Sequence, residues 1–173
     1  PIERYRGIEV VKGSGSIRFG PQTLVGVGNF LTLNPPPGTR VVVDSEGGQR
    51  GYARGLLGIG DSGENVRYVF QAFHKRGDGF RDINFNVTDV LGKVSFDTSR
   101  NGEFVLKVSF HDEQNDSDAV GLTREMYRMD PQRSKLAAFD RMSLQNVHVS
   151  AIQEQRFSAA SKLRTLVYAY RTD

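Results

Sequence analysis

Residues 91–110 read LGKVSFDTSRNGEFVLKVSF, and this stretch decides the fold. Its second half alternates apolar and polar residues at a period of two, the spacing of side chains on one face of a β-strand. The apolar members are Phe104, Leu106, Val108 and Phe110. Asn101-Gly102 separates this run from Val94 and Phe96, and Asn-Gly favours a type I′ turn between paired strands. The stretch predicts a β-hairpin whose apolar face packs in the core.

A short helix is expected after this hairpin. The polar run 111–116 is predicted to end the second strand. Ser117 is suited to cap a helix N-terminus, and Asp118 in the first turn would complement the helix dipole. Apolar residues then recur at helical spacing up to Met129. We therefore predict a helix over about residues 117–129.

Further strand-like segments lie on both sides of the hairpin. They cover residues 8–10, 17–19, 24–33, 39–44, 66–73, 83–88, 142–157 and 163–171. Nineteen glycines favour many turns between them. The predicted fold is mainly β, an antiparallel β-sandwich or barrel of about nine strands with one or two short helices.

Composition is that of one ordinary domain. The chain has 173 residues, 38% hydrophobic and 25% charged, and residues 1–173 are expected to form a single β domain. No apolar run approaches the ~20 residues of a spanning helix, so we predict no membrane association. The opening Pro-Ile-Glu-Arg-Tyr has no features of a signal peptide, and cysteine is absent. These features predict a location in the cytoplasm or in an assembled particle.

Residues 45–65 are rich in glycine and almost without hydrophobic pattern. We predict a long loop at about 45–65, ordered by a partner. It contains Gly58-Ile59-Gly60-Asp61-Ser62-Gly63, formally a dinucleotide-binding fingerprint. That site requires a buried strand before the glycines, and residues 52–57 are a poor buried strand. A plain turn is therefore the preferred interpretation.

No residue pattern indicates catalysis. His74, His111 and His148 are scattered without metal-ligand spacing, and no serine lies in a nucleophile elbow. The Arg-Gly-Asp tripeptide at 76–78 and the sequons at Asn86 and Asn115 are interpreted as accidental. We therefore predict no catalytic residues, no metal ligands and no cofactor.

Charge indicates two candidate surfaces. The net charge is only +3, but nine Lys and Arg lie between Arg124 and Arg171 against four acidic residues. Arginine and tyrosine favour both protein and nucleic-acid interfaces. The predicted interface residues are Arg50, Tyr52, Arg54, Lys75, Arg76, Asp78, Tyr168 and Tyr170. The candidate nucleic-acid contacts are Arg133, Lys135, Arg156, Lys162 and Arg164.

The order of these elements resembles a known family. The strand Gly-Lys-Val-Ser-Phe, the Asn-Gly hairpin, Phe-Val-Leu-Lys-Val-Ser-Phe, the polar Gln114-Asn115-Asp116 and a short helix are similar to the middle of bacteriophage tail-tube proteins. Residues 147–152 and 163–170 resemble the last two strands of such proteins. The resemblance covers about 75 residues and is one of pattern. It implies stacked hexameric rings without catalysis.

These observations rank three functions. The first is a non-catalytic virion component, most concretely of a phage tail tube, that self-associates through sheet edges and loops. Its partners would be further copies of itself and other virion proteins, in the virion or the host cytoplasm. The alternative is a nucleic-acid-binding β domain that uses the basic C-terminal third. A small enzyme ranks third.

Overall fold

The chain divides into two compact units, 1–34 and 35–173, where the sequence predicts one domain. The computed structural model describes residues 2–13, 25–81, 83–116, 121–133 and 141–173. In the first unit, a 3-10 helix η1 (Ile2–Arg4) precedes the antiparallel strands β1 (Tyr5–Lys12) and β2 (Gly26–Thr32). Tyr5 packs on Phe30, with ring centroids 5.0 Å apart. The predicted strand at 17–19 lies outside the described residues.

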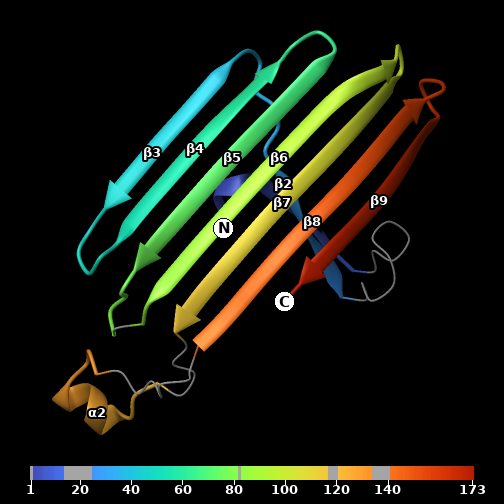
Figure 1. Ribbon diagram of the computed structural model, residues 1–173. Coiled ribbons are helices and arrows are strands. Elements are labelled where there is room, and N and C mark those ends of the chain that lie inside the picture. The colour runs from blue at the N-terminus through green and yellow to red at the C-terminus, as the bar shows by residue number, and fades with distance from the viewer. Residues whose placement is uncertain (1, 14–24, 82, 117–120, 134–140) are drawn as a thin grey trace. The chain divides into compact units, whose positions relative to one another are not determined.

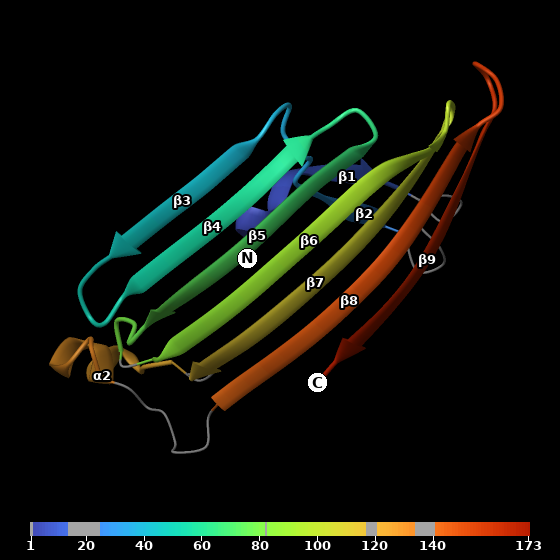
Figure 2. The same ribbon diagram turned by 45° about the horizontal axis from the view of Figure 1, so that its top comes forward.

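The second unit is built on one seven-stranded antiparallel sheet (Figure 1). Its strands are β3 (Arg40–Gly47), β4 (Ala53–Ser62), β5 (Val66–Gly77), β6 (Phe85–Ser99), β7 (Gly102–Asp116), β8 (Arg141–Arg156) and β9 (Lys162–Thr172). Each strand pairs with the next along the chain, and the sheet is curved and twisted (Figure 2). With β1 and β2, the described residues contain nine strands, so the predicted antiparallel, mainly β fold is confirmed.

The glycine-rich segment 45–65 is a hairpin, so the predicted long loop is wrong. β3 and β4 pair from Arg40–Gly60 to Gly47–Ala53. Arg50 and Gly51 have φ of 57° and 66°, the positive values that a type I′ turn requires at both central positions. Because β4 is hydrogen-bonded to β3 and to β5, cross-strand pairing outweighs the low strand propensity of glycine.

The central hairpin is confirmed as β6 and β7, joined by residues 100–101. Its turn differs from the prediction, because neither Asn101 nor Gly102 has positive φ and a register shift lies between Asp97 and Ser99. Gly102 is closely surrounded by side chains. A Cβ atom at this position would lie 2.5 Å from Gln155 Oε1 and 2.7 Å from Ser99 Oγ, so these side chains would have to move.

The helix is shorter than predicted. Strand β7 continues through the polar run to Asp116, so that run does not end the strand. Helix α2 (Arg124–Met129) is capped by Thr123, whose hydroxyl accepts a hydrogen bond from Met126 N at 3.3 Å. The predicted cap Ser117 lies outside the described residues. No helix among the described residues is long and apolar enough to cross a membrane.

The buried residues lie on the opposite face of the sheet from the one predicted. Leu106 and Val108 are 40% and 43% exposed. The buried hydrophobic side chains are instead Val69, Phe73, Val87 and Leu91. Polar residues are buried on that same face: Gln71, Asp89, Ser95, Ser109 and Ser150. The prediction that the apolar face of the hairpin forms the core is therefore wrong.

Leu91 provides a test of this buried cluster, because its side chain is only 1% exposed. We expect Leu91→Ala to lower the free energy of unfolding by roughly 2–5 kcal/mol, since a buried large-to-small change loses transfer energy and leaves a cavity. Leu91→Met is the control and should cost less than about 1.5 kcal/mol, because it conserves volume. Chemical denaturation measures both. Equal stability of the alanine variant and the wild type would remove Leu91 from the core.

Candidate functional site

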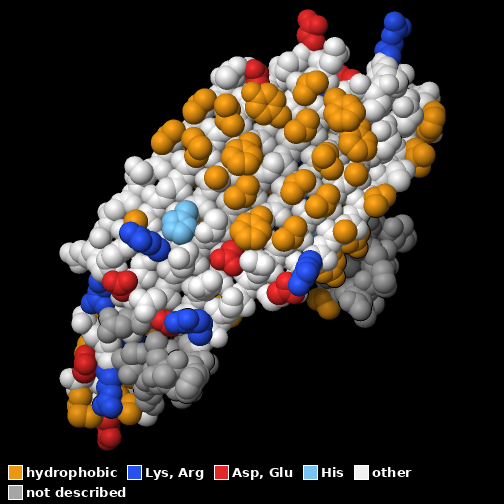
Figure 3. Space-filling model, in the orientation of Figure 1, with side chains coloured by type: hydrophobic (Ala, Val, Ile, Leu, Met, Phe, Trp, Pro, Cys, Tyr) orange, Lys and Arg blue, Asp and Glu red, His pale blue; other side chains and the backbone are white. Residues whose placement is uncertain are grey.

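The first candidate surface is the face of the seven-stranded sheet that carries Leu106. Cross-strand register places Val66, Phe96 and Phe104 in one row of this face and Ala72, Val90 and Phe110 in another. We call it the apolar face, and Figure 3 shows its hydrophobic side chains gathered in one band. It consists of Val41, Val43, Leu57, Ile59, Val66, Tyr68, Phe70, Ala72, Val90, Val94, Phe96, Phe104, Leu106, Val108, Phe110, Val147, Val149, Ala151, Leu163, Val167 and Ala169.

The apolar face is large and open. From Val66 to Ala72 it extends six residue steps, roughly 20 Å along the strand. Across seven strands it extends roughly 29 Å, at about 4.8 Å per strand. Monomeric soluble proteins rarely expose a contiguous apolar patch above a few hundred Å². A patch of this size indicates a surface that meets an apolar environment.

The opposite face of the sheet combines charged and polar residues with the buried hydrophobic side chains, and we call it the polar face. Arg67, Lys93 and Lys107 belong to it, between positions of the apolar face. Asp89 is only 2% exposed and pairs across the strands with His111. Soluble antiparallel sheets usually bury their apolar face and solvate the polar one. Here that arrangement is inverted.

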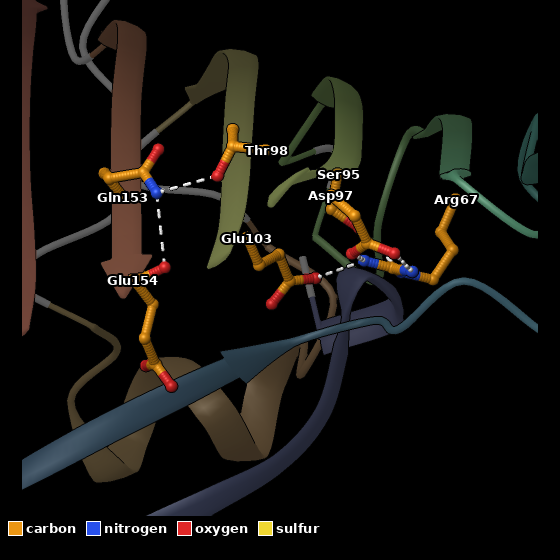
Figure 4. Close-up of polar contacts among 7 residues, drawn as sticks. All are labelled: Arg67, Ser95, Asp97, Thr98, Glu103, Gln153 and Glu154. Atoms are coloured by element: carbon orange, nitrogen blue, oxygen red, sulfur yellow. Dashed lines mark hydrogen bonds and ion pairs between the residues drawn. The ribbon is translucent and has the colours of Figure 1, made fainter. Parts of the chain in front are cut away.

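One ion-pair cluster on the polar face joins β5, β6 and β7 (Figure 4). Arg67 Nη2 lies 2.7 Å from Asp97 Oδ1 and 2.9 Å from Glu103 Oε1. Arg67 Nε also donates to Ser95 Oγ at 3.3 Å. One guanidinium therefore crosslinks three strands near their short connecting turns, and its five donors explain why arginine suits the position.

A second cluster surrounds His111, nearer the other end of these strands. Its Nδ1 lies 3.2 Å from Asp89 Oδ2, and its Nε2 lies 3.2 Å from Glu113 Oε2. Asn115 donates a short hydrogen bond to Glu113, and this donor, with a smaller contribution from His111, lowers the pKa of the Glu113 carboxyl. Among the described residues, no group of three or more His, Asp or Glu has the geometry of a metal site.

The lowered pKa of Glu113 predicts a pH-dependent contribution to stability. A carboxyl with a depressed folded-state pKa stabilises the fold above its ordinary pKa, and this stabilisation is lost as pH falls through the lowered value. Asn115→Ala removes the main donor, so we expect a loss of about 1 kcal/mol or less at pH 7. Denaturation curves should show this difference shrinking on acidification. A difference that stays constant down to acid pH would contradict the assignment.

At the strand ends next to α2, the side of the sheet that carries the apolar face becomes polar. A cavity of about 450 Å³ lies there, lined by Gly51, Arg76, Gly77, Asp78, Asn84, Phe85, Asn86, Gln114, Asn115, Asp116 and Arg141. We call it the end cavity. The β3–β4 turn packs against the β5–β6 turn at this end, because Asp78 N donates to Arg50 O at 2.9 Å. Arg50 Nη1 donates to Gly79 O at 3.1 Å, which fixes the two turns together.

The structure brings together six of the eight predicted interface residues. They gather at the α2 end of the sheet, where Arg54 is the cross-strand partner of Lys75, and they are Arg50, Tyr52, Arg54, Lys75, Arg76 and Asp78. The rings of Tyr52 and Phe85 lie 6.5 Å apart, and the Lys75 ammonium lies 6.0 Å from the Phe85 ring.

Within this group, Arg54 also forms an ion pair with Asp44 at 2.6 Å. The other two predicted interface residues lie elsewhere. Tyr168 and Tyr170 stack on the polar face of β9, with ring centroids 6.4 Å apart. The eight residues therefore do not form one surface.

The predicted nucleic-acid contacts do not form one surface either. Arg156, Lys162 and Arg164 flank the β8–β9 turn, and Lys162 Nζ lies 3.4 Å from Glu154. Arg133 follows α2 on the β7–β8 connection, at the opposite end of β8. Lys135 lies outside the described residues.

Comparison with known proteins finds solved structures that share the fold of this chain. No protein-family model and no curated protein matches the chain. The ferric-catecholate import receptor Fiu from E. coli K12 matches with a TM-score of 0.76 and 15% identity, over 95% of this chain and 28% of the receptor. The chain has the fold of part of a receptor. The ferripyoverdine receptor of the outer membrane of Pseudomonas aeruginosa, bound to ferripyoverdine, matches with a TM-score of 0.70 and 17% identity, over 95% of this chain and 23% of that one.

These structures overturn the function predicted from the sequence. This fold matches an import receptor and an outer-membrane receptor. Four predictions are therefore wrong: a phage tail-tube or other virion component, a hexameric ring, a location in the virion or cytoplasm, and the absence of membrane partners. The nucleic-acid alternative is wrong for the same reason. The resemblance of pattern to tail-tube proteins itself stays a prediction.

The apolar face is what the sequence reasoning missed, and a signal for it was present. Strands β5, β6 and β7 each alternate apolar residues with polar or charged ones such as Arg67, Lys93 and Lys107. Repeated period-two alternation between turns is the sequence signature of transmembrane strands. We interpreted it as a soluble core because alternation alone does not tell which face meets water.

Proposed function

We propose that residues 35–173 form part of the wall of a transmembrane β-barrel, in an outer-membrane receptor that takes up chelated ferric iron. The observation that carries the proposal is the apolar face, which stays in register over seven strands while charged residues occupy the polar face. Such barrels carry an apolar band outside and a polar interior. The receptors with the same fold support the ligand class.

Strand length agrees with this proposal. A transmembrane β-strand needs about 9–11 residues, and strands β4 to β9 have 10 to 16. The apolar face covers the half of each strand near the short β4–β5 and β6–β7 turns. The other half of each strand, toward α2, carries polar residues on that side of the sheet and would project beyond the hydrocarbon layer.

The two edge strands of the sheet, β3 and β9, need further pairing partners in a membrane. β3 and β9 each pair with one strand among the described residues. In a bilayer, each backbone N–H and C=O group must be paired, so an open sheet edge is not tolerated. We therefore propose that additional strands of the same protein pair with β3 and β9. The chain spans about a quarter of the length of the matching receptors, which is consistent with such strands. We propose no catalytic role for the segment.

Single-cysteine spin labelling tests the proposal in the full protein, with any cysteine outside residues 1–173 replaced by serine, because residues 1–173 contain none. Val94→Cys and Leu106→Cys place the label on the apolar face, and Lys93→Cys and Lys107→Cys are neighbouring controls on the polar face. In bilayers, we expect labels on the apolar face to collide preferentially with oxygen, which concentrates in lipid. Labels on the polar face should respond less to oxygen relative to a water-soluble nickel chelate.

The ratio of the oxygen to the nickel collision rate should therefore be high at Val94 and Leu106. It should be low at their neighbours Lys93 and Lys107, because successive side chains of a strand point to opposite faces. Greater access of the nickel chelate to Val94→Cys and Leu106→Cys than to their lysine neighbours would show that the apolar face meets water. That result would contradict the proposal.

A further inference from the structure

The end cavity lies where the outward surface changes from apolar to polar. Arg76, Asn86 and Gln114 form one cross-strand row on the same side of the sheet as the apolar face. This row is four residues beyond the last apolar row, roughly 13 Å along the strands. With strands tilted by about 45°, the distance along the membrane normal is roughly 9 Å. Figure 3 shows charged side chains gathered at this end of the sheet.

The cavity offers hydrogen-bond donors suited to an anion. Arg76 is exposed, and the Arg141 side chain is 72% exposed. Amide side chains of Asn86 and Gln114 line the cavity between the two guanidinium groups. A guanidinium group presents a planar pair of N–H donors that matches the oxygens of a phosphate.

The acidic groups of the cavity are partly engaged. The Asp116 carboxylate accepts hydrogen bonds from Asn84 Nδ2 at 2.8 Å and Asn84 N at 3.2 Å, and lies 3.7 Å from Arg141 Nε. Asp78 also lines the cavity, and its carboxylate lies beside Gly51.

We infer that the end cavity binds the phosphate of an anionic lipid headgroup, with Arg76 and Arg141 as its charged donors. This inference rests on the proposed function, because only a sheet embedded through its apolar face brings the cavity to headgroup depth. The interfacial layer on each side of a bilayer is roughly 5–8 Å thick, and long arginine side chains reach along the surface to it. The cavity would thus fix the height of the sheet in the membrane.

Spin-labelled lipids test the inference in the native protein reconstituted into bilayers. Lipids that contact a protein give a motionally restricted spectral component, and its size for labelled phosphatidylglycerol is compared with that for labelled phosphatidylcholine. Each basic residue near an anionic lipid surface contributes a roughly fivefold preference, so two arginines contribute a roughly 25-fold preference at this site. We expect the wild type to prefer phosphatidylglycerol by about that factor, and Arg76→Gln with Arg141→Gln to abolish the preference.

Two control variants separate charge from general damage. Arg156→Gln with Arg164→Gln removes two positive charges from the polar face, and the preference should be unchanged. Arg76→Lys with Arg141→Lys keeps both charges, so most of the preference should remain. At equal ionic strength, millimolar inorganic phosphate should not compete, since the acyl chains hold the lipid in place.

Three results would overturn the inference. A preference retained in the double glutamine variant would exclude Arg76 and Arg141 as its source. Competition by inorganic phosphate would assign the cavity to a soluble phosphate compound. If the restricted component has equal size in the wild type and the double glutamine variant, the sheet still contacts lipid and only the lipid site is refuted. If neither lipid gives a restricted component, the proposed function is refuted as well.

Discussion

Cross-strand register is the constraint on which the rest of the structure depends. Side chains alternate between the two faces of a strand, so a shift of one residue in any pairing would move that strand's apolar residues to the polar face. The one register shift among the described strands of this sheet, between Asp97 and Ser99, lies next to the β6–β7 turn. Over the rest of the sheet, antiparallel pairing keeps five residues on one side: Leu57, Phe70, Val94, Leu106 and Val149. The exposed apolar face is a property of the whole sheet, and no single strand could produce it.

The two faces of the sheet differ in how their side chains are stabilised. On the polar face, two clusters pair charged groups across strands: Arg67 crosslinks three strands, and His111 lies between Asp89 and Glu113. A buried polar group without a partner costs free energy, so such clusters hold the sheet in a single arrangement. On the apolar face, side chains such as Leu106 and Val108 are open, which is unfavourable in water and favourable in lipid. The same sheet would therefore be insoluble alone and stable in a bilayer.

The sequence predicted the strands well and their environment poorly. The run at Leu106 and the Asn101-Gly102 signal identified the central hairpin, because alternation and turn chemistry are local. The β3–β4 hairpin was not predicted, because the glycine-rich strand β4 is stabilised by pairing with a strand on each side and not by its own propensity. The end cavity assembles Arg76, Asn86 and Arg141 from three strands, and no local pattern joins them. Which face is solvated depends on the surrounding phase, which the period of two does not encode.

Lipid contact of the apolar face is the central claim, and tryptophan fluorescence tests it most directly. Residues 1–173 contain no tryptophan, so the signal of each variant is compared with that of the unsubstituted protein. Leu106→Trp places an indole on the apolar face of β7, and Lys107→Trp places one on the polar face of the same strand. In bilayers of lipids brominated on the acyl chains, bromine quenches indole by contact. We predict strong quenching for Leu106→Trp and weak quenching for Lys107→Trp. Equal quenching of the two, or stronger quenching at Lys107, would contradict the account.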